Sequence, residues 1–373
     1  MALKIVHIAK TAIAGAPIRL VQSLRRLTDY EVRLINWERE KDFDSDLVFS
    51  ENPDQAIAVA EAADIIHLHN FIDLRTRHFA PLDFEQLRRQ GKVFVRQFHS
   101  HPLILAITWR QEIPAAQRRA EMARFRARLA NELPSLVVGQ FQERYYPDAF
   151  VVPNLIPEQE PLYRPSEEPW RYGMCFTPSN DCSAWKSRWN TKGAPETMQL
   201  MMRVIKATKT PYCFLFEKPL SVALEQRRQA LVVIDELVTG SFHLAGLEGL
   251  CQGKAVLAFL DERTQRVLRE LSGSQECPFL NVRLEDAFDP LMYLLRNPDI
   301  ARDIGRHSRE WFEDHWAERK MIQHYITAYE ILLQDPTQLR RQEVFRIRNR
   351  ADQFRAQVLP DLVYHARRRM RRA

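Results

Sequence analysis

The chain has 373 residues, of which 45% are hydrophobic and 27% charged. This length and composition predict a folded globular protein large enough for two α/β domains. No apolar run approaches the roughly 18 residues that a membrane-spanning helix needs. A strand pattern begins at once, so we expect no signal peptide. The five cysteines form no CxxC pair, which favours reduced thiols in the cytoplasm and argues against a structural zinc site.

The net charge of +6 is concentrated at the end of the chain. From Asp335 onward, eleven arginines and four carboxylates give a charge of +7, which leaves about −1 for residues 1–334. The predicted body is therefore nearly neutral and carries a basic tail.

Strand and helix patterns alternate through residues 1–152, which we take as a first Rossmann-like domain. Strands are expected at 3–9, 31–37, 64–70, 92–98, 136–138 and 150–152, and helices at 18–24, 55–63 and 114–132. This order predicts a parallel sheet with helices on both faces. Gly15 lies in the small-residue loop between the first strand and helix, a position typical of nucleotide-binding domains. One glycine does not make a GxGxxG fingerprint.

A proline-rich passage at 153–169 is the predicted linker. A second alternating series covers 170–318 and predicts a second Rossmann-like domain, and 319–373 is expected to form C-terminal helices and the basic tail. Two such domains joined by one linker predict a cleft between them, faced by the carboxyl ends of both sheets.

The stretch 231–260 is the most informative part of the second series. A β-branched strand leads to Ser241, a plausible helix N-cap. Gly246 and Gly249 follow inside the predicted helix, where each glycine costs about 1 kcal/mol against alanine. The backbone of this helix is therefore expected to approach another group closely, and Glu248 lies between the two glycines.

Several segments, in this order, resemble the GT-B glycosyltransferases, specifically the retaining, nucleotide-sugar-dependent group called glycosyltransferase family 4. The matching segments are 4–20, 64–69, 94–99, 151–154, 192–193, 241–248 and 253–256. The resemblance spans about residues 3–333. It implies α/β GT-B architecture, with two Rossmann-like parallel-sheet domains facing across a cleft and a C-terminal helical tail. It also implies that residues 1–152 form the acceptor-side domain and residues 170–318 the nucleotide-sugar donor domain.

The resemblance implies that Glu248 holds the ribose hydroxyls of the nucleotide, since a carboxylate accepts two hydrogen bonds from a diol. The alternative is a solvated helix glutamate. A second family glutamate, which contacts the donor sugar, is replaced here by Gly240. Main-chain N–H groups near Ser241, together with His243, would then hold the sugar, unless the sugar site is altered.

His99 matches the family histidine that faces the transferred sugar, where it can donate to a sugar hydroxyl or to phosphate. A locally satisfied strand-end histidine is the alternative, and His101 is a competing candidate. His67 and His69 lie inside a strand, which favours a structural role.

The resemblance assigns an arginine and a lysine to the diphosphate leaving group, whose charge cations and helix N-termini stabilise. Lys192 fits the lysine, and Arg188 and Lys186 compete for the arginine position. Each of them could instead be an exposed loop cation. No metal or other cofactor is expected, and the nucleotide-sugar donor is a substrate.

Two further patterns favour simpler interpretations. Asp44-Ser45-Asp46 is a DxD sequence, but it precedes its strand in a charged segment and is interpreted as a solvated loop. In the tail, Val344, Ile347, Ala351, Phe354 and Val358 recur at helical spacing. We expect this stripe to pack on the body and the last seven residues to interact electrostatically with surfaces, including anionic membranes.

The sequence thus predicts a cytoplasmic hexosyltransferase, possibly peripheral to the inner face of a membrane. It would transfer a sugar from a nucleotide-diphosphate donor to a glycan or lipid-linked acceptor of the cell-surface polysaccharide type. A catalytically inactive GT-B-like protein that binds a nucleotide or glycan is the alternative. A second alternative, a nucleic-acid-binding factor, depends on the basic tail alone. We therefore expect no nucleic-acid partner.

Overall fold

The computed structural model describes residues 2–40, 43–101, 114, 117, 120, 121, 123, 124, 133–140, 142–178, 180–185 and 192–371. The helix predicted over 114–132 lies largely outside these residues. The chain forms two compact units. The N-terminal unit contains Met1–Pro102, Ala120–Leu155 and Glu318–Phe345, and the C-terminal unit contains Leu103–Arg119, Ile156–Ala317 and Arg346–Ala373.

The N-terminal unit is built on a seven-stranded parallel sheet of order β3-β2-β1-β4-β5-β6-β7. The strands are β1 (Lys4–Ala9), β2 (Glu31–Asn36), β3 (Leu47–Val48), β4 (Ile65–His69), β5 (Val93–Phe98), β6 (Ser135–Val138) and β7 (Phe150–Val152). The central strands are buried on both faces, as their continuous apolar runs predict.

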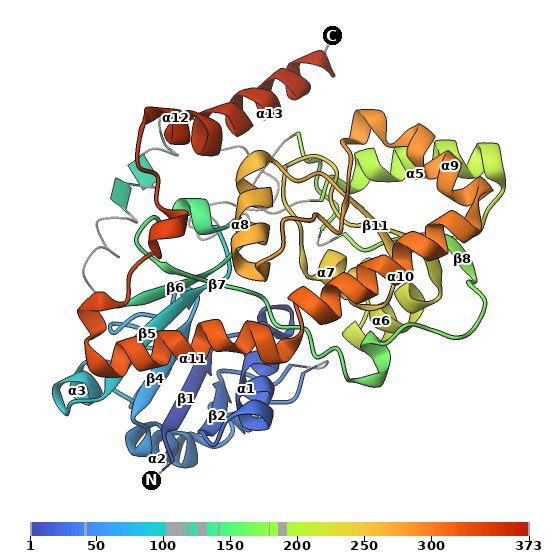
Figure 1. Ribbon diagram of the computed structural model, residues 1–373. Helices are drawn as coiled ribbons and strands as arrows, with labels where there is room; N and C mark the ends of the chain where they lie inside the picture. The colour runs from blue at the N-terminus through green and yellow to red at the C-terminus, as the bar shows by residue number, and fades with distance from the viewer. Residues whose placement is uncertain are drawn as a thin grey trace. The chain divides into compact units, whose positions relative to one another are not determined.

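The helices of this unit come from both ends of the chain. They are η1 (Ile13–Gly15), α1 (Ala16–Leu27), α2 (Pro53–Ala62), α3 (Phe84–Arg89), η3 (Gln142–Tyr145), α11 (Glu318–Gln334), η6 (Pro336–Gln338) and η7 (Glu343–Phe345). Helix α11 lies along one face of the sheet (Figure 1) and buries Tyr325, Tyr329 and Leu332 there. Ser23 of α1 donates a hydrogen bond to Glu318 and so ties the start of α11 to the same unit.

The C-terminal unit is built on a five-stranded parallel sheet of order β12-β11-β10-β8-β9. Its strands are β8 (Tyr172–Phe176), β9 (Tyr212–Phe214), β10 (Ala230–Ile234), β11 (Ala255–Ala258) and β12 (Leu280–Asn281). Its helices are η4 (Pro161–Tyr163), α5 (Ala194–Thr208), α6 (Leu220–Arg228), α7 (Leu244–Cys251), α8 (Glu262–Ser272), η5 (Leu284–Asp286), α9 (Phe288–Arg296), α10 (Pro298–His315), α12 (Arg350–Gln353), the π-helix η8 (Phe354–Val358) and α13 (Leu359–Met370). The prediction of two parallel-sheet units is confirmed.

The two glycines of α7 let this helix pack directly on the sheet. A Cβ atom at Gly249 would lie 3.1 Å from Val256 Cγ2 and 3.3 Å from Val233 Cγ1. At Gly246 it would lie 2.5 Å from Asp235 Oδ2. The close approach expected from the glycines is therefore an approach to the sheet and to Asp235.

The basic tail packs differently from its predicted stripe. Val344, Phe354 and Val358 are 37%, 47% and 42% exposed, so the expectation that they pack on the body was wrong. Helix α13 is instead held by Tyr364 and Arg367, which are buried. Among the described residues, no helix has the length and apolarity to cross a membrane.

Candidate functional site

A buried ion pair lies at the carboxyl end of β10. Asp235 directly follows this strand, and Lys192 Nζ lies 2.7 Å from its Oδ1, with side-chain exposures of 3% and 0%. Burial acts to raise the pKa of Asp235, but the charge of Lys192 and then of His243 hold this pKa below its usual value. Lys192 is therefore not the exposed loop cation of the alternative interpretation.

The N-terminus of α7 meets the same carboxylate. The backbone N–H of His243, the N-cap residue, donates to Asp235 Oδ2 at 2.6 Å, while its side chain makes no capping hydrogen bond. His243 Nδ1 lies 3.8 Å from Asp235 Oδ1 and is buried without a hydrogen bond. Burial lowers the pKa of His243 to about 4; Asp235 opposes this shift and Lys192 adds to it. The ring is neutral at pH 7, and among the described residues its Nδ1 has no hydrogen-bond partner.

Glu248 belongs to a second buried ion pair. Arg227 Nη1, from the last turn of α6, lies 2.5 Å from Glu248 Oε2, and Arg227 Nη2 lies 3.4 Å from Thr177 Oγ1. Both charged side chains are buried, which excludes the solvated glutamate of the alternative interpretation. Nothing in the sequence distinguishes Arg227, because a basic residue in the last turn of a helix is common for reasons of the helix dipole alone.

A tightly bonded turn connects β10 to α7. The carboxylate of Glu236 accepts the backbone N–H groups of Val238 at 2.5 Å, Thr239 at 2.6 Å and Ser241 at 3.3 Å, together with the Thr239 hydroxyl at 2.8 Å. Burial raises the pKa of Glu236, although these hydrogen bonds oppose the shift. Ser241 is buried and donates its hydroxyl to the carbonyl of Phe242 rather than capping the helix.

Gly240 lies within this turn in a conformation that requires glycine. Its φ is 86°, and an added Cβ would lie 2.9 Å from the Cβ of Asp261. A non-glycine residue here would meet both backbone strain and a steric clash. The conformation of this turn therefore requires glycine at position 240, where the family resemblance places a glutamate.

The remaining predicted residues divide between the N-terminal unit and positions outside the described residues. Gly15 is the N-cap of α1 with φ 78°, and an added Cβ would lie 2.5 Å from the Phe43 ring. His99 follows β5, and its Nε2 lies 2.9 Å from His69 Nδ1. His101 is buried with its ring edge-on to Tyr145. Lys186 and Arg188 lie outside the described residues.

The structure therefore brings Lys192 and His243 together around Asp235, with Ser241 in the adjoining turn and Glu248 on the same helix as the His243 cap. A buried cation beside a helix N-terminus that has no side-chain cap is a chemically suitable place for a phosphate group, because the helix N–H groups and the cation both favour negative charge. The uncommitted His243 nitrogen adds a neutral hydrogen-bonding group.

No protein-family model and no curated protein matches the sequence. Solved structures of glycosyltransferases, in contrast, share its fold. Sucrose-phosphate synthase from Thermosynechococcus elongatus is 12% identical, with a TM-score of 0.56 over 89% of this chain and 99% of that chain. HepE from Anabaena, in complex with UDP and glucose, is 11% identical, with a TM-score of 0.58 over 88% and 99%. An alpha-glucosyltransferase in complex with UDP and a 13-mer DNA is 10% identical, with a TM-score of 0.59 over 89% and 100%.

These likenesses extend over nearly the whole length of each known chain and confirm the predicted GT-B fold. At 10–12% identity they show the fold, and the chemistry of this chain has to be argued from its own residues.

Proposed function

We propose that this chain is a retaining glycosyltransferase that transfers a sugar from a nucleotide-diphosphate donor to a glycan or lipid-linked acceptor. The observation that carries the proposal is the buried Lys192–Asp235 pair beside the N-terminus of α7, which has no side-chain cap. The fold supports it, because HepE and the alpha-glucosyltransferase were solved with UDP. Retention of configuration and a cell-surface polysaccharide acceptor follow from the family resemblance.

In this proposal the donor diphosphate binds at the N-terminus of α7. Lys192 and the helix N–H groups stabilise the charge that develops on the leaving diphosphate, without requiring a metal ion. A bound diphosphate competes with Asp235 for Lys192, and the Asp235 carboxylate holds the lysine beside the N-terminus of α7. Glu248 is assigned to the ribose hydroxyls, Arg188 or Lys186 to the second cation position, and His99 to the sugar.

Calorimetric titration of the full chain with UDP, GDP, ADP and their sugar conjugates tests the binding step. One nucleotide series is expected to bind, and His243→Ala is expected to weaken that binding, since the side chain leaves the site while the backbone N–H that holds Asp235 remains. His307→Ala, at an exposed helix position, is the matched control. Absence of measurable heat with every nucleotide would exclude the proposal.

Gly240 supports a second candidate, a nucleotide-binding GT-B protein without transfer activity. The turn that carries Gly240 has no room for the family's sugar-side carboxylate. Release of free sugar and nucleotide from a donor panel separates the two candidates: slow hydrolysis of one donor supports the transferase, and binding with no hydrolysis or transfer supports the inactive protein.

We further propose that the protein works at the cytoplasmic face of an anionic membrane. Phe354, Val358 and Leu362 are exposed and spaced four residues apart, so they follow one another along the C-terminal helical segment, with Arg355 and Arg369 exposed on the same segment. The full chain should co-sediment with phosphatidylcholine vesicles only when phosphatidylglycerol is included. A Val358→Glu, Leu362→Glu variant should remain in the supernatant, and equal sedimentation of both proteins would exclude the contact.

A further inference from the structure

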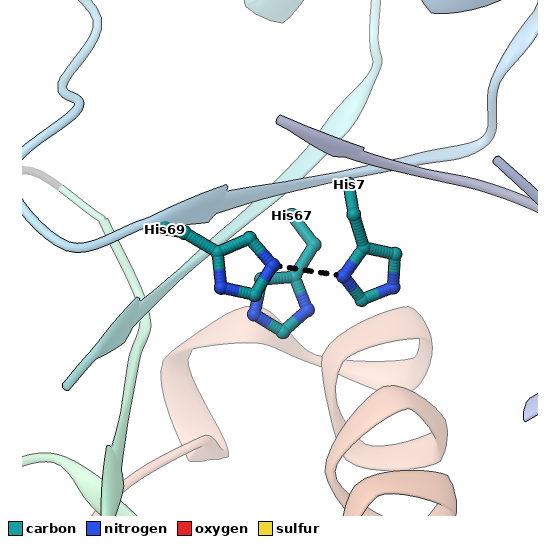
Figure 2. A group of neighbouring side chains, drawn as sticks. All are labelled: His7, His67 and His69. Atoms are coloured by element: carbon teal, nitrogen blue, oxygen red, sulfur yellow. Dashed lines mark hydrogen bonds between the residues drawn. The ribbon is translucent and has the colours of Figure 1, made fainter. Parts of the chain in front are cut away.

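Three buried histidines in the N-terminal unit lie outside the candidate site. His7 comes from β1, and His67 and His69 come from β4. Figure 2 shows their rings side by side, and one ligand nitrogen of each lies within 4.8 Å of the others. The His7 and His67 rings are stacked at an interplanar angle of 27°, and the His67 and His69 rings at 12°. Stacked rings do not direct their in-plane lone pairs at one metal ion, so we interpret these histidines as part of the core.

A cavity of about 320 Å³ lies in the C-terminal unit, at the carboxyl ends of β10, β11 and β12. This volume is at the lower end of the range for small-molecule pockets. One wall is formed by residues that follow these strands. The other is formed by the C-terminal helical segment of η8 and α13, which lies beside α8 (Figure 1). The carboxyl edge of an open parallel sheet is where ligands of α/β proteins bind, so this cavity is well placed for one.

The interior of the cavity is mostly apolar. Val238, Phe259 and Leu260 line it from the sheet, and Leu359 and Val363 line it from the helical segment. Leu359 and Val363 are four residues apart, so they share one face of α13, and both are only partly buried. A ligand in the cavity would remove these apolar side chains from water, which favours binding.

Several polar side chains that line the cavity are committed to the protein itself. The Asn281 amide accepts from the Leu260 N–H at 2.9 Å and donates to the Leu260 carbonyl at 3.1 Å. Gln265 Nε2 donates to the same carbonyl at 3.0 Å, and Asp261 Oδ1 accepts the Thr264 N–H at 2.9 Å as the cap of α8. A polar ligand would therefore lose hydrogen bonds to water with little replacement, whereas an apolar ligand has none to lose.

The charged residues around the cavity balance one another. Arg283 and Arg355 line it together with Asp261 and Glu262, and Arg283 Nε also lies 3.1 Å from Asp286 Oδ2. Two cations and two carboxylates in the lining give no net charge, so the lining selects neither an anion nor a cation. An uncharged, apolar group is the ligand class that this cavity fits best.

The helical segment that closes the cavity also carries the exposed apolar side chains Phe354, Val358 and Leu362. The same segment thus lines the cavity with one set of residues and presents an apolar stripe to the outside with another. A hydrocarbon chain from a membrane in contact with this stripe would have only this segment to pass. On the sheet side, Val238 and Thr239 directly precede Gly240, so a chain in the cavity would lie beside the turn that leads to α7.

We propose that this cavity binds the hydrocarbon chain of the acceptor, and hence that the acceptor is lipid-linked and not a free glycan. The inference rests on the proposed function and narrows its acceptor class. Leu359 and Val363 are the side chains assigned to contact the chain, together with Phe259 from the sheet. A free glycan would have no group to place among them.

Octyl glucoside, used below its micelle concentration, is a suitable probe because it joins a hydrocarbon chain to a sugar. Calorimetric titration of the full chain is expected to show saturable binding with a negative change in heat capacity, the mark of buried apolar surface. Methyl glucoside, which has the same sugar without the chain, should not bind. Equal binding of the two compounds would identify a sugar pocket and overturn the proposal, as would no binding of octyl glucoside.

Two adjacent residues locate the bound chain. Val363→Trp fills the cavity and is expected to weaken octyl glucoside binding at least tenfold, whereas Leu362→Trp, at a position that is 54% exposed, should leave it unchanged. Leu359→Gln makes the same wall polar at similar size and should also weaken binding, which provides a second test if Val363→Trp does not fold. Weakening by Leu362→Trp alone would place the chain on the exposed stripe and overturn the proposal.

The same protein preparation, titrated with the nucleotides and their sugar conjugates, separates this inference from the proposed function. Octyl glucoside binding that Val363→Trp abolishes, with no binding of any nucleotide, would refute the proposed function and leave the apolar cavity site in place. Nucleotide binding without octyl glucoside binding would refute the cavity site alone.

Discussion

Any side chain at position 240 would add both backbone strain and a steric clash, and substitution by alanine measures their combined cost. Its φ of 86° disfavours any other residue, and Asp261 occupies the space that a side chain would need. Gly240→Ala is expected to reduce the free energy of unfolding by about 1–3 kcal/mol, measured by urea denaturation.

Gly273 is the matched control for this substitution. It lies in the same unit with φ 69°, and an added Cβ would meet nothing within 4 Å. Gly273→Ala should therefore cost less than Gly240→Ala, because it carries the strain without the clash. Equal losses would show that Asp261 moves aside, and the turn could then accept a side chain.

The Lys192–Asp235 pair predicts a second effect at the residue scale. Lys192→Met leaves the buried Asp235 carboxylate without its cation, and breaking a buried pair in this way costs about 3–5 kcal/mol. Adding Asp235→Asn should recover part of that loss, since the amide is neutral and still accepts from the His243 N–H. Urea unfolding of both variants measures the difference, and a double variant no more stable than Lys192→Met would argue against the charge as the cause.

At the scale of elements, α13 holds the turn beside the candidate site. Arg367 is buried and donates from Nη1 to the Val238 carbonyl at 2.6 Å and from Nη2 to the Leu237 carbonyl at 3.0 Å, while also pairing with Glu285 at 2.6 Å. The hydroxyl of Tyr364 donates to the Ala184 carbonyl. The C-terminal helix therefore stabilises the backbone that leads into Gly240.

Arg367→Met is expected to loosen this turn, because two carbonyl groups lose a buried charged donor. Amide hydrogen exchange at Thr239 and Ser241 should accelerate, measured by mass spectrometry of the full chain, and nucleotide affinity should fall if the site lies where we propose. Arg369→Met, on the exposed side of the same helix, should leave exchange unchanged. Unaltered exchange in both variants would remove α13 from any role in the turn.

The elements themselves were largely predictable from the sequence, and their contacts were not. Continuous apolar runs identified the strands around His67 and Val233, since buried parallel strands have that pattern. Arg367 stands in a run of three arginines, and nothing local distinguishes the buried one from its neighbours. The Arg227–Glu248 pair joins two helices through residues that are 21 positions apart, a contact that only the tertiary fold defines.

For the whole molecule, the buried histidines predict a loss of stability in mild acid. Burial lowers the pKa of His7 from 6.5 to about 3, so between these values the unfolded chain binds a proton that the native chain does not. The free energy of unfolding should fall as the pH drops below about 6.5, by about 1.4 kcal/mol per pH unit for this one proton. The pKa of His67 and that of His69 are lowered in the same direction, which steepens the slope.

Urea midpoints measured between pH 7 and pH 5, where most carboxylates remain ionised, check this prediction. Midpoints that stay constant over the range would mean that these histidines bind protons equally in the native and unfolded states.

The position of α11 in the N-terminal unit has a consequence for the order of synthesis. This helix supplies Tyr325 and Tyr329 to a sheet whose strands all lie before residue 153, so a ribosome makes the whole stretch 156–317 before the helix that covers that sheet. Helix α11 can therefore cover its face of the N-terminal sheet only after residues 318–334 have left the ribosome. Completion of the first half of this protein is thus tied to translation of the second, and the halves cannot mature as independent products.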